Sequence, residues 1–282
     1  KRQDLSSATG GALTVRGYHG GELGAGPVEQ YVRVVQGVAD IAWGLPGYTS
    51  SQFEKTMIVE LPGTLSNEDA GYAAMWKAYS DHLASEFPGT VPVALWTSEP
   101  NVFIMKDHVI RKPSDLAGLK VRVAGATAAD VATALGATPV QMPINQVYNA
   151  LQTGLIDGVI TGSSTLNDFK LDEVANSYTF GANLGRLSFY AVMNKKKYDS
   201  LSAEHRAALD NVRGMPLSKS AEDAWNETAI EGVAAARLLD DNTFVDLTEA
   251  EAAAFAAAIA PVTGAYVDAV GGQAAQAAMQ AK

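Results

Sequence analysis

A single arginine interrupts an apolar segment of the chain at position 122. The surrounding residues read GLKVRVAG, which predicts a short strand with Arg122 between two valines. An unpaired buried charge is costly, so a cation in mid-strand must face a cleft, reach the surface or form a buried ion pair. If Arg122 faces a cleft, it is an anion receptor and the chain binds small acids.

Patterns typical of catalysis, metal binding or nucleotide binding are weak in this chain. The glycine turn at residues 20–26 fits neither the dinucleotide fingerprint nor a phosphate loop ending in Gly-Lys-Ser/Thr. The four histidines, at positions 19, 82, 108 and 205, share no metal-ligand spacing. Gly162-Ser163-Ser164 is not a nucleophile elbow. The sequence therefore predicts no cofactor, no metal and no enzymatic activity.

Two aspartates, Asp40 and Asp157, follow helix-ending glycines and open apolar strands. Such carboxylates commonly accept hydrogen bonds from nearby amides, so we interpret both as strand-entry caps. Four aromatics lie at or just past predicted strand ends, where ligands bind in open α/β sheets, although core or hinge packing is an equal alternative. These aromatics are Trp43, Tyr48, Trp96 and Phe103.

Bulk composition limits the classes of partner. The chain has 282 residues, 47% of them hydrophobic, which is enough for one large or two medium domains with a sizeable core. A net charge of −10 argues against nucleic acid and anionic membranes as partners. The absence of cysteine excludes disulfides and thiolate sites. No apolar run approaches the length of a membrane span, so no direct membrane insertion is expected.

The elements that must position Arg122 alternate between strands and helices. Apolar segments predict strands at residues 12–20, 39–48, 91–100, 101–110 and 187–194, and periodic segments predict helices between them. A long helix is expected over 217–240, and two alanine-rich helices over 248–260 and 264–281. The pattern is that of an α/β protein with a mostly parallel sheet.

Several ordered motifs resemble one family. They are a Gly-Gly-Glu-Leu-Gly turn at 20–24, Gly-Val-Ala-Asp-Ile at 37–41, Leu61-Pro62, a segment from Pro113 to Arg122 that is followed by Leu-Gly-Ala-x-Pro at 135–139, and a segment from Val147 to Gly158. In order and spacing they resemble the solute receptors of tripartite ATP-independent periplasmic (TRAP) transporters, the C4-dicarboxylate-receptor-like family.

That resemblance implies a two-lobed periplasmic binding protein fold with mixed, mostly parallel sheets, hinge strands and a long interlobe helix. It places residues 1–99 with 188–225 in one lobe and residues 100–187 with 226–282 in the other. It also places residues 1–9 late in the first family helix, so that the first family strand would precede Lys1. A small carboxylate would bind between the lobes and pass to TRAP permease subunits, from a periplasmic location.

The resemblance also assigns residue roles. The arginine of the family's Gly-Leu-Lys-x-Arg strand, here Arg122, bridges the ligand carboxylate through its planar fork. Thr161 replaces an asparagine that holds the carboxylate, Val102 replaces a second arginine, and Ile144 replaces an aromatic residue. The implied ligand-binding residues are Arg122, Thr161, Asn183, Trp43, Tyr48, Val102, Trp96 and Ile144.

These departures favour a monocarboxylate with an apolar or aromatic body, since a second carboxylate would face Val102 and Leu45. Two other classes stay open on the sequence. One is a receptor of an ABC importer or a sensor system, and the other is a cleft-bearing α/β enzyme.

Overall fold

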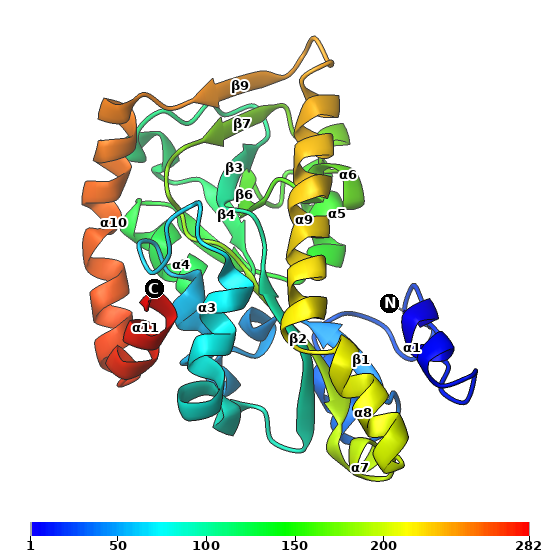
Figure 1. The fold of residues 1–282 in the computed structure, drawn as a ribbon. Coiled ribbons are helices and arrows are strands. Elements are labelled where there is room, and N and C mark those ends of the chain that lie inside the picture. Colours follow the sequence, from blue (N-terminus) through cyan, green and yellow to red (C-terminus); the bar gives the residue numbers. More distant parts are fainter. Residues whose placement is uncertain (1, 282) are drawn as a thin grey trace.

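The computed structural model describes residues 2–281, and its strands form two separate sheets (Figure 1). The smaller sheet has the order β1-β8-β2, formed by Ile41–Gly44, Ser188–Asn194 and Thr90–Thr97. β8 runs antiparallel to both neighbours. Its side chains are mostly buried, as expected for a central strand covered on both faces.

The larger sheet contains Arg122 and has the order β5-β4-β6-β3-β7-β9. The strands are β5 (Thr138–Gln141), β4 (Lys120–Val123), β6 (Gly158–Gly162), β3 (Asn101–Met105), β7 (Ser177–Phe180) and β9 (Thr243–Asp246). β4 is parallel to β5 and β6, and β7 is parallel to β9, whereas β3 is antiparallel to both of its neighbours. The α/β class with mixed sheets is confirmed. The expectation of mostly parallel pairing is wrong, because only three of the seven strand pairs in the described residues are parallel: β8 and β3 each run antiparallel to both neighbours.

Three connections join the two sheets. Residues 98–100 lead from β2 to β3, and residues 181–187 lead from β7 back to β8. Helix α9 (Met215–Ala236) packs against β2 of the smaller sheet and against α6 (Thr165–Asp168), beside the larger one (Figure 1). This helix is the long interlobe helix expected over residues 217–240.

A buried carboxylate, Glu60, ties elements of both sheets together at the end of η2 (Thr56–Glu60). It accepts hydrogen bonds from the Ser188 amide at 2.9 Å and hydroxyl at 2.6 Å, and from the Thr127 hydroxyl at 2.9 Å. Ser188 opens β8, and Thr127 lies in α4 (Ala126–Ala134), which covers the larger sheet. Burial raises the pKa of the Glu60 carboxyl, against the effect of these three donors.

The C-terminal helices cover the other side of the molecule (Figure 1). α10 (Glu249–Ala269) begins at a Thr248–Glu251 capping box and packs against α4. By length and composition alone α10 could cross a membrane, although the sequence contains no unbroken apolar run of that length. Its Phe255, Ile259 and Val267 are buried against the protein. α11 (Gln273–Gln280) packs against α3 (Gly71–Ala78), although the predicted lobe boundaries place these two helices in different lobes.

The strand predicted over residues 12–20 is wrong. No strand forms there, and Val15 and Tyr18 are exposed. These residues border a groove along β1, whose only ladder partner among the described residues is β8. A strand needs a ladder partner, and the apolar alternation of this segment finds none here.

The remaining helices are short. The α-helices are α1 (Arg2–Ala8), α2 (Gln30–Val35), α5 (Val147–Gln152), α7 (Lys195–Asp199) and α8 (Ala203–Val212). The 3₁₀ turns are η1 (Pro46–Gln52), η4 (Ala84–Glu86), η5 (Pro113–Leu116), η6 (Ile144–Gln146) and η7 (Leu171–Glu173), and η3 (Tyr79–Leu83) is a π-helical turn. Lys1, placed late in a helix by the sequence comparison, lies outside the described residues.

Candidate ligand-binding site

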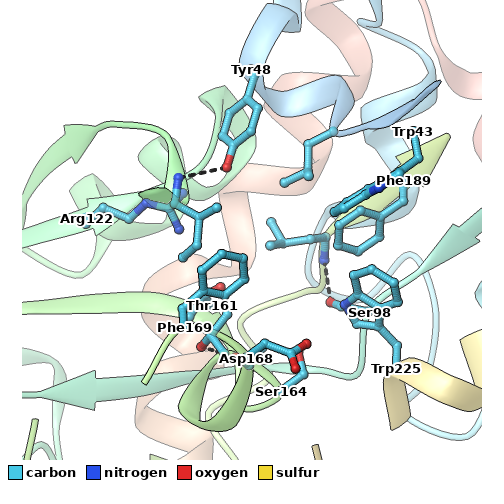
Figure 2. A pocket seen from close by; sticks show the side chains of 15 residues that line it. Trp43, Tyr48, Ser98, Arg122, Thr161, Ser164, Asp168, Phe169, Phe189 and Trp225 are labelled. Carbon is cyan, nitrogen blue, oxygen red and sulfur yellow. Dashed lines mark hydrogen bonds between the residues drawn. The ribbon is translucent and has the colours of Figure 1, made fainter. Parts of the chain in front are cut away.

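A pocket lies between the two sheets, and elements of both line it (Figure 2). Its empty volume is about 460 Å³, its open mouth included. The smaller sheet's side contributes Trp43, Leu45, Tyr48, Leu187 and Phe189; the larger sheet's side contributes Arg122, Ile144, Thr161, Gly162, Ser164, Thr165, Asp168 and Phe169; Ser98 and Trp225 complete the lining.

Arg122 lies in β4, with Val121 and Val123 buried on either side of it. Its side chain is 1% exposed and enters the pocket (Figure 2). Nε donates to the Met142 carbonyl at 2.9 Å, which fixes the plane of the guanidinium. Nη2 is buried and has no hydrogen-bond partner among residues 2–281. A free donor on a buried cation is a binding position for an anion.

The electrostatics of Arg122 agree with that geometry. Burial lowers the pKa of the guanidinium below its usual range, while the neighbouring Tyr48 hydroxyl acts in the opposite direction. In the described part of the chain, no carboxylate lies within ion-pair distance of Arg122. The buried ion pair considered from the sequence is therefore not found among residues 2–281.

Tyr48 joins the two sides of the pocket. It lies in η1, and its hydroxyl accepts a hydrogen bond from the Ile144 amide at 3.0 Å (Figure 2). Nearby, the backbones of Gly47 and Gly125 touch, and a Cβ on Gly125 would lie 2.7 Å from the Gly47 Cα. Only glycine allows the two sides to approach this closely.

An aromatic wall faces Arg122 across the pocket (Figure 2). Phe189 of β8 lies 4.7 Å from Trp225 of α9 and 6.1 Å from Trp43 of β1, measured between ring centroids. Trp43 is 50% exposed and marks the mouth. Trp96 stacks on Phe189 at 5.4 Å from behind and does not line the pocket. Such a wall offers a large apolar surface to a flat ligand.

A second polar group supports the floor of the pocket from the hinge. Glu99 lies between β2 and β3 and is buried, and its Oε1 accepts from the Ser164 amide at 2.6 Å. A Cβ on Gly162 would lie 2.3 Å from this oxygen, so the close packing requires glycine. Burial raises the pKa of Glu99, and the nearby Asp168 charge adds to that rise.

The pocket collects five of the eight predicted site residues: Trp43, Tyr48, Arg122, Ile144 and Thr161. The other three lie elsewhere. Trp96 is behind the wall, Val102 is buried in the core beside Ile104, and Asn183 is exposed in the β7–β8 connection with a left-handed φ of 50°. The left-handed conformation at position 183 suits asparagine, which tolerates it better than most residues.

Sequence reasoning missed Phe189, Trp225 and Asp168 as pocket residues. Phe189 was visible as an aromatic near the start of a predicted strand, the same signal that pointed to Trp43. Trp225 was hidden, because the pocket-facing side of a helix that touches two lobes has no simple periodic signature.

Of the predicted strand-entry caps, Asp157 accepts from the Lys120 amide at 2.7 Å, while the Asp40 carboxylate instead pairs with Lys197 at 3.5 Å.

No metal-binding constellation accompanies this pocket. Across residues 2–281, no group of three or more His, Asp or Glu side chains is arranged to hold a metal ion. Among the polar groups of the pocket, the free guanidinium nitrogen and the Thr161 hydroxyl can donate hydrogen bonds, and the Asp168 carboxylate can accept them.

Comparison with known proteins identifies the family. Residues 2–268 match the family model described as bacterial extracellular solute-binding protein, family 7. The chain belongs to that family. It is a solute-binding receptor of the TRAP type, in a family of receptors and not of enzymes. The alternatives of an ABC-importer receptor, a sensor domain or an enzyme are therefore set aside.

Individual relatives are distant in sequence and close in fold. The C4-dicarboxylate-binding periplasmic protein DctP of Rhodobacter capsulatus is 25% identical over 94% of this chain and 80% of its own length. A TRAP solute-binding protein of Rhodoferax ferrireducens, solved with copurified benzoate, is 28% identical, with a TM-score of 0.93 over 99% of this chain and 89% of that one. A marine metagenome TRAP protein specific for aromatic acids, solved with 3-hydroxybenzoate, is 29% identical, with a TM-score of 0.90 over 99% of this chain and 89% of that one. The two-lobed fold is thus confirmed, and the family's members are periplasmic receptors.

Proposed function

We propose that this receptor binds an aromatic monocarboxylate, with the carboxylate on Arg122 and the ring against the wall of Trp43, Phe189 and Trp225. The observation that carries the proposal is the buried Nη2 of Arg122, which has no partner among the described residues and lies in a pocket faced by aromatic rings. A carboxylate would complete a charge-assisted pair with it. Thr161, buried beside it, would add one hydroxyl donor.

The charge of the lining decides between one carboxylate and two. Arg122 is the single cation among the fifteen side chains that line the pocket. A dicarboxylate would leave its second charge against Leu45, Leu187 or the aromatic wall, which is unfavourable. The relatives solved with benzoate and 3-hydroxybenzoate support this reading, whereas the name of the Rhodobacter relative points to C4-dicarboxylates.

The wider role follows from the family. We infer that the chain acts in the periplasm and delivers its ligand to TRAP permease subunits. We expect the lobes to meet where residues 98–100 and 181–187 connect the two sheets, which is where the predicted boundaries at 99/100 and 187/188 lie. α9 supplies Trp225 to the pocket, so a movement of α9 between the lobes would move this ring of the wall.

Calorimetric titration of ligand-stripped protein tests the proposal. Benzoate should bind with a dissociation constant of about 1 μM or tighter, roughly −8 kcal/mol, and succinate and malate should bind at least a hundredfold more weakly. Mass spectrometry of ligand released by denaturation should find an acid with one carboxylate. Tight succinate or malate binding with no aromatic acid bound would refute the proposal.

A further inference from the structure

Asp168 is a second charged group on the pocket, and neither its sequence context nor the arginine bridge accounts for it. It is the last residue of α6. In Figure 2 its carboxylate points into the space between Thr161 and Trp225, away from the Arg122 guanidinium. In the described part of the chain, no cation and no hydrogen-bond donor contacts this carboxylate. Asp168 is exposed, and partial burial raises the pKa of its carboxyl.

The groups around Asp168 make this end of the pocket negative. Glu99 lies close enough for the Asp168 charge to raise the pKa of the Glu99 carboxyl, and its Oε2 is buried without a partner among residues 2–281. The neighbouring lining residues Ser98, Ser164 and Trp225 carry no charge. The Ser98 hydroxyl already donates to the Glu99 carbonyl and accepts from the Leu187 amide. The pocket therefore has a positive end at Arg122 and a negative end at Asp168.

We propose that Asp168 selects for the end of the ligand opposite its carboxylate: it accepts a hydrogen bond from a hydroxyl or protonated amine there, and it repels a second carboxylate. This inference rests on the proposed binding of an aromatic acid at Arg122. A hydrogen bond to an ionised acceptor is stronger than one between neutral groups, so the donor-bearing acid is favoured. Asp168 is exposed, so solvent screens part of its charge, but a second carboxylate beside it would still meet a like charge, and the diacid is disfavoured. The ligand class is thus an aromatic acid with a donor on its far side.

Titration of a probe series against three proteins tests the inference. The probes are benzoate, the 3- and 4-hydroxybenzoates, the corresponding aminomethylbenzoates and the corresponding benzenedicarboxylates. In the wild-type receptor at least one donor-bearing probe should bind about tenfold more tightly than benzoate, and the diacids at least tenfold more weakly. Asp168→Ala should abolish the donor preference. Asp168→Asn keeps the shape and an acceptor oxygen, so it should mainly restore diacid binding, by about tenfold relative to benzoate.

Asp172→Asn is the matched control, because it removes the same charge from the next turn of chain, outside the pocket lining. It should leave every ratio unchanged. Affinity ratios that stay at wild-type values in both Asp168 variants would overturn the inference while leaving the proposed function intact, provided benzoate still binds. If no aromatic acid binds, the proposed function fails. The inference about Asp168 is then tested on the acid released from the purified protein: an acid without a hydrogen-bond donor opposite its carboxylate overturns it.

Discussion

Replacing Arg122 should separate ligand binding from stability, because its buried Nη2 has no hydrogen-bond partner in the part of the chain that the structure describes. We consider Arg122→Met, which keeps much of the volume and removes the charge. Truncating one partner of a buried charge pair costs roughly 2–5 kcal/mol in affinity. At about 1.4 kcal/mol per tenfold, benzoate should bind about 30- to 4,000-fold more weakly.

The effect on the unliganded protein should have the opposite tendency. The variant loses the 2.9 Å bond from Nε to the Met142 carbonyl, worth about 1 kcal/mol, but it also removes a buried cation that no described carboxylate balances. Apolar replacement of buried ions is often neutral or stabilising by about 1–4 kcal/mol. The free energy of unfolding without ligand should therefore stay level or rise. Arg122→Lys keeps the charge without the planar fork, so its benzoate affinity should be intermediate.

Urea unfolding with and without benzoate, beside calorimetric titration, measures both effects. With benzoate at a thousandfold excess over the wild-type dissociation constant, the wild-type protein should gain about 4 kcal/mol. At the same benzoate concentration Arg122→Met should gain about 2 kcal/mol if its affinity is about 30-fold weaker, and almost none if it is about 4,000-fold weaker. Unchanged benzoate affinity in the methionine variant would refute the bridge. A variant that loses several kcal/mol without ligand would instead assign Arg122 a structural role.

Three further predictions concern the contacts between the two sides of the pocket. Gly125→Ala should lower stability by about 1–3 kcal/mol in urea unfolding, because its Cβ would lie 2.7 Å from the Gly47 Cα. Tyr48→Phe should weaken benzoate binding about fivefold by calorimetry, since losing the hydroxyl that accepts from the Ile144 amide costs about 1 kcal/mol. Glu60→Gln should flatten the fall of stability with pH: the folded state raises the Glu60 pKa, so its contribution is full below the unfolded value and is lost as pH rises through the folded one.

Each of these has an outcome that contradicts it. Gly264→Ala is the control for Gly125, since nothing lies within 4 Å of a Cβ there, and equal effects of the two would remove the close-contact argument. Full affinity in Tyr48→Phe would mean that the Ile144 amide finds water as an equal partner. A Glu60→Gln profile parallel to the wild-type one between about pH 5 and 8 would show that Glu60 stays ionised when folded.

The sequence revealed those parts of the fold whose signal is local. A charge between valines gave Arg122, because burial makes an isolated cation conspicuous in an apolar strand. The continuous apolar run of β8 and the long periodicity of α9 were equally readable. The segment at residues 12–20 has the same alternation as a strand yet forms none, because a ladder partner is a property of the tertiary structure and not of the segment.

The site was less predictable, because a pocket is made by residues far apart in sequence. Trp225 and Phe189 meet at 4.7 Å although two helices, α7 and α8, lie between them in the chain. Phe103 was predicted, like Trp43, to lie at a strand end where ligands bind. It is instead fully buried and packs on Phe255 of α10. The position of an aromatic residue at a strand end therefore predicted the edge of the sheet at which the pocket lies. It did not predict which face of the sheet the side chain occupies, because packing determines that.

The residues that line the pocket, and not the residue at position 102, favour a ligand with a single carboxylate. From the sequence this preference depended on Val102 standing where relatives carry a second arginine, yet Val102 is buried in the core and does not line the pocket. The charges of the pocket lining favour one ligand carboxylate. Arg122 is the one cation among the lining residues, and Asp168, the one lining carboxylate, has the same sign as a second ligand carboxylate. An absent cation only fails to bind a diacid, whereas a facing carboxylate opposes it. The proposed selectivity for a monoacid would therefore depend on Asp168 as much as on Arg122, and introducing a cation at position 102 should not convert this receptor to diacids while Asp168 remains.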